Sequence, residues 1–89
     1  MEPLDLPIDG VLDLHTFSPK ELPYLLVDYL TACRDKDIYE VRIIHGKGTG
    51  VLRERVHALL KKSPMVAGFS TAPESAGGWG ATLVKLKRP

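Results

Sequence analysis

A glycine-rich segment, HGKGTG at residues 45–50, separates two stretches of different hydrophobic periodicity. The stretch before it, Tyr39–Ile44, is rich in branched apolar side chains and is typical of a buried strand. After the segment, apolar side chains recur at helical spacing at Val51, Leu52, Val56, Leu59 and Leu60, and Ser63 and Pro64 end the pattern. A strand, a glycine turn and a helix are therefore expected in succession, which indicates an α/β fold with this loop at the carboxyl end of a strand.

The same periodicities organise the rest of the chain. We expect further strands over residues 11–15, 65–71 and 81–87, and a helix that begins at residues 18–21 and ends in the polar run 34–37. At its start Ser18 is the expected N-cap, Pro19 the first helical residue and Glu21 the partner in a capping box. Pro23 would then cost this helix one backbone hydrogen bond. The predicted order is β-α-β-α-β-β.

The two outer stretches indicate how the helices are placed. In the first strand Leu12 and Leu14 share one face, whereas Asp13 and His15 share the other. The last strand separates Thr82, Val84 and Leu86 from Leu83, Lys85 and Lys87 in the same way. Because only one face is suited to burial, we expect a two-layer sandwich, with both helices on one face of a four-stranded mixed sheet.

Length and composition indicate a single small domain. The 89 residues and their 44% apolar content suit one globular unit over residues 11–89, preceded by a short N-terminal arm at residues 1–10. The chain holds no apolar run near the roughly 20 residues that a membrane crossing needs, and its acidic start is unlike a signal peptide. The single cysteine, Cys33, excludes an internal disulfide and a multi-cysteine zinc site, so a reducing cytoplasm is expected.

Charge is distributed unevenly along the chain. Residues 1–40 carry nine acidic and three basic side chains, a net charge of −6. Residues 41–89 carry nine basic and two acidic side chains, a net charge of +7. This asymmetry suits either a polyanionic partner bound by the second half or attraction between the two halves within the fold.

The glycine segment matches neither common nucleotide-binding fingerprint. A GxGxxG motif would need glycine at Val51, and a Walker loop would need serine or threonine directly after Lys47. Glycines that leave backbone N–H groups uncovered, a helix N-terminus and Lys47 could nonetheless hold one phosphate. The alternative is a flexible connector without a ligand.

Asp13 and His15 are the candidate proton-transfer pair. At a spacing of two residues the carboxylate can orient the imidazole, which titrates near neutrality. Two alternatives are a surface pair without function and a metal site completed by His45. Trp79 could stack on a base or cover an edge of the core, and His57 is expected to be a solvated helix residue.

Three blocks together resemble the small MutS-related (Smr) domain family: LDLH at 12–15, VRIIHGKGTGVLR at 41–53 and GGWGATLVKL at 77–86. The resemblance spans about residues 8–88. It implies a two-layer α/β sandwich similar to the C-terminal domain of bacterial translation initiation factor three. It also implies an endonuclease that nicks or cleaves DNA in repair and recombination, or messenger RNA on ribosomes.

The family motifs fall on particular residues of this chain. The resemblance implies catalytic roles for Asp13, His15 and Lys47. We expect nucleic-acid or phosphate contacts at His45, Gly46, Gly48, Gly50, Arg53, Trp79, Lys85 and Lys87. Thr16 stands where the family often has glycine after the Asp-x-His motif.

The expected partner is RNA or DNA, with the ribosome as a further candidate. No ATP use is expected, because the ATPase and clamp regions that accompany the domain in the recombination suppressor do not occur in this sequence. No metal ligands are assigned, although a divalent metal could participate. The alternatives to an endonuclease are a non-catalytic RNA- or DNA-binding module and a protein-interaction domain.

Overall fold

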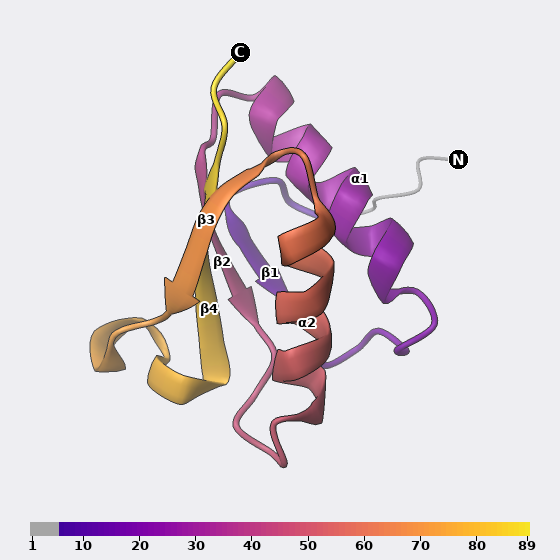
Figure 1. Ribbon diagram of the computed structural model, residues 1–89, viewed down its shortest axis with the longest axis vertical. Coiled ribbons are helices and arrows are strands. Elements are labelled where there is room, and N and C mark those ends of the chain that lie inside the picture. Colours follow the sequence, from indigo (N-terminus) through magenta and orange to yellow (C-terminus); the bar gives the residue numbers. More distant parts are fainter. Residues whose placement is uncertain (1–5) are drawn as a thin grey trace.

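A four-stranded mixed sheet forms one layer of the protein. The computed structural model describes residues 6–89, and Figure 1 shows the arrangement of its elements. The strand order is β1-β2-β4-β3. β1 (Val11–Asp13) is parallel to β2 (Glu40–Ile44), and β4 (Ala81–Leu86) runs antiparallel between β2 and β3 (Val66–Thr71). The predicted mixed sheet is confirmed.

Both helices pack on the same face of this sheet (Figure 1). α1 (Leu22–Asp35) connects β1 to β2, and α2 (Val51–Lys62) connects β2 to β3. Both connections join parallel strands and progress in the same direction across the sheet. Right-handed crossovers that progress in one direction place their helices on one face. The element order and the two-layer architecture are therefore those expected from the sequence.

The core lies between the sheet and the helices. Its largest fully buried side chains come from every layer: Tyr29, Leu12, Leu14, Leu22, Leu30, Ile43, Leu60, Val41, Val56 and Val84. The predicted faces of the first and last strands in the chain are confirmed, since Leu12, Leu14, Thr82, Val84 and Leu86 are all buried. Cys33 is also fully buried and free, as expected for a small apolar residue. On α2, Val51 is exposed, so the predicted apolar stripe loses its first member.

The predicted start of α1 was wrong. The helix begins at Leu22, and residues 18–21 form turns in which Glu21 N–H donates to the Ser18 carbonyl at 3.0 Å. One arm of the capping box is present, because the Glu21 carboxylate accepts the Ser18 N–H at 2.9 Å. Pro23 is the second helical residue, where an N–H would have no intrahelical acceptor, so the expected loss of a hydrogen bond does not occur.

Other boundaries differ by one or two residues. β1 ends at Asp13, although Leu14 N–H still donates to the Ile44 carbonyl at 2.9 Å. The connection before β4 contains two short 3₁₀ turns, η1 (Glu74–Ala76) and η2 (Gly78–Gly80). Strand ends fray where a ladder loses its neighbour, which accounts for such shifts.

The predicted N-terminal arm lies partly outside the described residues, which begin at Leu6. Leu6 and Ile8 pack against the core, and Gly10 is buried. No helix within residues 6–89 is long and apolar enough to cross a membrane.

The Tyr29 hydroxyl fixes the entry to β1. It accepts the Gly10 N–H at 3.1 Å and donates to the Val11 carbonyl at 3.0 Å. Burial is the main cause that raises the Tyr29 pKa to about 12. We predict that Tyr29→Phe lowers the free energy of unfolding by about 1–3 kcal/mol, because the buried Gly10 N–H loses its acceptor. Urea unfolding measures this change. Tyr24→Phe, at a 75% exposed tyrosine of the same helix, is the control and should change nothing.

Candidate functional site

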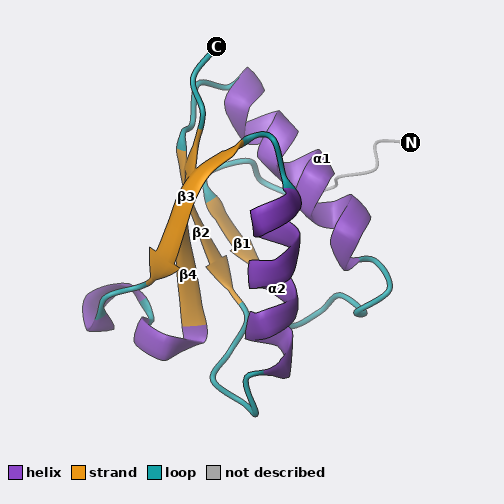
Figure 2. Ribbon diagram, viewed as in Figure 1, coloured by secondary structure: helices purple, strands orange, loops and turns teal. Residues whose placement is uncertain are grey.

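Strand pairing brings the candidate residues to one edge of the sheet. Asp13 pairs with Ile44, Ile44 with Ala81, and Thr82 with Thr71. The ends of β1, β2 and β3 and the start of β4 therefore meet at the same edge. We call this edge the rim; it comprises residues 13–17, 45–50 and 71–80, and Figure 2 shows its loops at the lower end of the strands.

Asp13 and His15 form a preoriented pair at the rim. One oxygen, Asp13 Oδ1, accepts the His15 backbone N–H at 3.0 Å and contacts His15 Nδ1 at 2.8 Å. Since an ionised carboxylate only accepts, His15 Nδ1 carries the proton and the neutral ring keeps Nε2 as a free acceptor. These bonds from the His15 backbone and then its ring lower the Asp13 pKa. The side chains are 76% and 48% exposed for His15 and Asp13, so a solvent-borne substrate can reach them.

The glycine loop bends sharply between β2 and α2. Gly46, Gly48 and Gly50 have φ angles of 81°, 28° and 86°, which side chains with a Cβ rarely adopt. A Cβ at any of the three would meet nothing within 4 Å, so the backbone conformation and not lack of room calls for glycine. Within residues 6–89, the N–H groups of residues 47–50 donate no backbone hydrogen bond. They are available to an anion, whereas the Gly46 N–H already donates to the Gly80 carbonyl.

Two hollows lie at the rim, one at the pair and one at the loop. One, of about 250 Å³, is lined by Asp13, His15 and Thr16, and the other, of about 310 Å³, by the whole glycine loop. Phe17 lines both, so this residue lies between the two hollows. Arg55 lines the loop hollow and was missed as a site residue. Its position four residues after Val51 would have placed it on the loop side of α2.

On the far side of the loop lies the GGWG turn at residues 77–80. The Gly80 carbonyl accepts the N–H groups of His45 at 3.0 Å and Gly46 at 2.9 Å. A Cβ at Gly80 would lie 3.3 Å from Lys47 Cγ, so the turn and the loop are in direct contact. Lys47 is exposed at this contact. The structure thus brings Asp13, His15, the loop and the turn to the rim.

Buried His45 and half-buried His57 belong to one hydrogen-bonded chain, the histidine chain. His45 Nδ1 lies 3.1 Å from the Gly46 carbonyl, which can only accept, so this nitrogen carries the proton. Neutral His45 then accepts the Thr82 hydroxyl at Nε2, 2.9 Å away, and His57 Nε2 donates to that hydroxyl at 2.8 Å. The expectation of a solvated His57 was wrong, because Thr82 and the Phe69 ring, 4.8 Å away between centroids, hold it against the sheet.

The histidine chain argues against a metal site formed by Asp13, His15 and His45. Both of its ring nitrogens are engaged, and His45 is buried. Among residues 6–89, no group of three or more His, Cys, Asp or Glu side chains is placed to hold a metal ion. His45 therefore supports the loop from beneath and does not join Asp13 and His15 as a third ligand.

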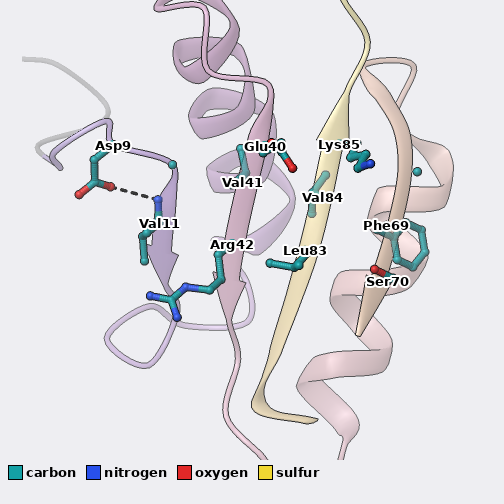
Figure 3. Close-up of a pocket in the computed structure, with 12 residues that line it drawn as sticks. Asp9, Val11, Glu40, Val41, Arg42, Phe69, Ser70, Leu83, Val84 and Lys85 are labelled. Carbon is teal, nitrogen blue, oxygen red and sulfur yellow. Dashed lines mark hydrogen bonds between the residues drawn. The ribbon is translucent and has the colours of Figure 1, made fainter. Parts of the chain in front are cut away.

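Two predicted contacts lie away from the rim. Lys85 pairs with Glu40 at the start of β2, and the Lys87 N–H donates to the Met65 carbonyl, so both are at the opposite end of the strands. A larger hollow, of about 520 Å³, lies on the face of the sheet opposite the helices. Figure 3 shows Arg42 and Leu83 on this face, and Arg42 donates to the Ala76 carbonyl at 3.2 Å.

The comparisons with known proteins agree with this arrangement. Residues 12–87 match the family described as the Smr domain. The chain belongs to the Smr domain family. The family resemblance expected from the three motif blocks is confirmed, and those blocks are the segments that build the rim and the strands behind it.

Two solved structures share the fold of this Smr domain. The crystal structure of the Smr domain of Thermus thermophilus MutS2 has a TM-score of 0.82 and 32% identity, and the match covers 89% of this chain and 99% of that one. YdaL, a stand-alone small MutS-related protein from Escherichia coli, has a TM-score of 0.83 and 26% identity; the match covers 92% and 67% of the two chains.

Similar curated proteins bear the name Endonuclease MutS2. The protein from Clostridium tetani is 35% identical over 80 residues, which are 90% of this chain and 10% of the relative. The protein from Solidesulfovibrio magneticus is 56% identical over 48 residues, 54% of this chain and 6% of the relative. The chain thus spans at most about a tenth of the length of these relatives.

The histidine chain makes stability depend on pH. Burial, followed by the positive charge of Arg53 and smaller contributions from His45 and Lys61, lowers the His57 pKa below its ordinary value of 6.5. Between the folded and unfolded pKa values the unfolded chain binds more protons, so the free energy of unfolding falls as pH drops below about 6.5. The contribution of Asp13, whose pKa is lowered from 3.8, is lost only in a more acidic range.

We predict that the melting temperature of the wild type falls more between about pH 7.5 and about pH 5.5 than that of His57→Gln. The glutamine amide can still donate to Thr82 but does not titrate. Thermal unfolding followed by circular dichroism at each pH measures the difference. An equal fall in melting temperature for the two proteins over this pH range would contradict the assignment of this pH dependence to His57.

Proposed function

We propose that this Smr domain cleaves the phosphodiester backbone of nucleic acid at the rim. The observation that carries the proposal is the exposed Asp13–His15 pair, hydrogen-bonded at 2.8 Å, at the same edge as the glycine loop. A general base, an orienting carboxylate and anion-binding N–H groups are what such a reaction needs. The relatives named Endonuclease MutS2 and the net positive charge of residues 41–89 add support.

His15 is the proton-transfer group in this proposal. Its free Nε2 takes a proton from the attacking oxygen, while Asp13 keeps the ring in the required tautomer and stabilises the imidazolium that forms. On RNA the attacking oxygen is the 2′-hydroxyl, whose attack on the adjacent phosphorus expels the 5′-oxygen. This leaves a 2′,3′-cyclic phosphate, and the 5′-oxygen takes a proton from water to become a 5′-hydroxyl. On DNA a water molecule takes the place of the 2′-hydroxyl.

Lys47 and the loop stabilise the charge that develops on the phosphate. The N–H groups of residues 47–50 donate no backbone hydrogen bond within residues 6–89, and Lys47 lines the loop hollow; Phe17 lines both this hollow and the one at His15. Donors fixed in place before the reaction do not have to reorganise during it. Arg55, which lines the same hollow, adds a second positive charge.

One observation favours a binding module without catalysis as the second candidate. The His15 side chain is 76% exposed, so the protein alone does not exclude water from the reacting groups. In this case the rim would bind the same backbone without cleaving it. A ribosomal setting for either function stays a prediction from the family resemblance.

We predict that His15→Ala lowers the cleavage rate about 10²–10⁴-fold, because a positioned proton-transfer group is lost. Asp13→Asn, which cannot balance the imidazolium charge, should also lower it. End-labelled single-stranded RNA, duplex DNA and branched DNA are incubated with each protein, with and without EDTA, and products are resolved on a gel. Asp35→Asn, at an exposed carboxylate at the other end of α1, is the control.

An Asp13→Ala/His15→Ala double variant that cleaves like the wild type would exclude the mechanism. Wild-type binding without cleavage would favour the second candidate.

We predict that Lys47→Ala weakens nucleic-acid binding and reduces the slope of log affinity against log salt by about one, because one phosphate contact is lost. Fluorescence anisotropy of a labelled oligonucleotide at several salt concentrations measures both quantities. Lys85→Ala is the matched control, since it removes the same charge at the opposite end of β4. If Lys85→Ala has the larger effect, the rim is not the principal backbone contact.

A further inference from the structure

Trp79 is the large aromatic side chain of the rim. It lies in the turn η2, and 57% of its surface is exposed. The Arg53 side chain lies over its ring, and Arg53 also lines the hollow of the glycine loop, so the indole stands near this loop. The ring thus lies on one side of the loop, and the Asp13–His15 pair lies on the other.

The indole is held in a fixed orientation. The Arg53 guanidinium lies over the ring, 4.1 Å from its centroid. Arg53 is itself held, since its Nη2 donates to Thr71 Oγ1 at 3.0 Å. Within residues 6–89, Arg53 Nε is buried without an acceptor. The guanidinium thus contacts the ring and Thr71 at once, and these two contacts define its position over the indole.

One face of the ring remains open. Arg53 covers one face, and more than half of the residue is still exposed, which leaves the other face as the open side of the ring. The residues next to Trp79 in the chain are glycines, Gly78 and Gly80, so neither adds a side chain beside the ring, although the Glu74 carboxylate lies against Gly78. Lys47, Arg53 and Arg55 surround the loop with positive charge, which suits a polyanion more than an apolar peptide.

We propose that Trp79, backed by Arg53, is the stacking platform for one unpaired nucleobase next to the phosphate that the glycine loop holds. Stacking on an aromatic side chain requires a base whose face is free, and bases inside a duplex already stack on their neighbours. The proposal therefore names the substrate class: single-stranded or locally unpaired nucleic acid. It rests on the proposed function of the rim.

The chain contains one tryptophan, so emission excited at a wavelength that its three tyrosines barely absorb reports on Trp79 alone. The protein is titrated with an oligothymidylate, an oligouridylate and a fully paired blunt duplex of the same length, and the tryptophan emission is followed. Anisotropy of labelled strands gives the affinity independently. We expect the two single strands to quench the emission at the concentrations at which anisotropy reports binding, and the duplex to leave it nearly unchanged.

Variants separate stacking from charge. Trp79→Ala should weaken single-strand binding roughly tenfold to a hundredfold, and Trp79→Phe should retain most of the affinity because it keeps an aromatic face. Duplex affinity should change little in either variant. Tyr24→Ala removes a 75% exposed aromatic ring from α1 and is the matched control, with unchanged binding expected.

The outcomes distinguish this proposal from the proposed function. Single-strand binding with unchanged emission and full affinity in Trp79→Ala overturns the stacking platform and leaves the backbone contacts intact. Equal quenching by the duplex also overturns it. If no nucleic acid binds the wild type under any salt condition, the proposed function fails and the platform fails with it.

Discussion

A single carbonyl group, that of Gly80, joins the two loops on which the candidate site depends. It accepts the N–H groups of His45 and Gly46, and so fixes the first residues of the glycine loop to the turn before β4. The two segments are more than thirty residues apart in sequence, yet a Cβ at Gly80 would already crowd Lys47. Without this contact the loop would be attached only at β2 and α2, and neither Lys47 nor Trp79 would have a fixed position relative to the other.

The histidine chain supports the same region from the helix side. Thr82 follows the turn at the second position of β4, and its hydroxyl links His45 at the base of the loop to His57 on α2. In the neutral form every donor of this chain has an acceptor, so no charge is buried beneath the loop. The positive charges that could attract a polyanion, on Lys47 and Arg55, remain at the surface, where hydration offsets their cost.

Much of the fold could be predicted because period and face are properties of short segments. The alternation of Leu12 and Leu14 with Asp13 and His15 was sufficient to place one layer of helices, and the exposure of the pair followed from it. Residue types alone could not fix the start of α1, since Ser18, Pro19 and Glu21 form a sound N-terminal signal one turn too early. Here a turn before the helix makes the capping hydrogen bond between Ser18 and Glu21, so the same residue pattern does not mark the first helical residue.

The site was predicted only in part, because its remaining members depend on contacts distant in sequence. His57 reads as a surface residue from its own segment, and only the return of β4 supplies Thr82 as its partner. The separation of Lys85 and Lys87 from the rim likewise follows from the strand order, in which β4 runs antiparallel to β2. Periodicity gives the face on which a side chain lies but not which end of a strand meets a given loop.

The layout of the rim also accounts for the open position of His15. An enclosed pocket excludes water with protein side chains, whereas residues 6–89 form one small core and leave the Asp13–His15 pair exposed. In the arrangement proposed here the nucleic acid supplies part of the enclosure. Its backbone spans from the Asp13–His15 pair to the loop, and an unpaired base lies on Trp79 beyond it. Such a site would discriminate by the conformation of the substrate more than by the depth of a pocket, because backbone and base must engage at the two sides of one short loop at the same time.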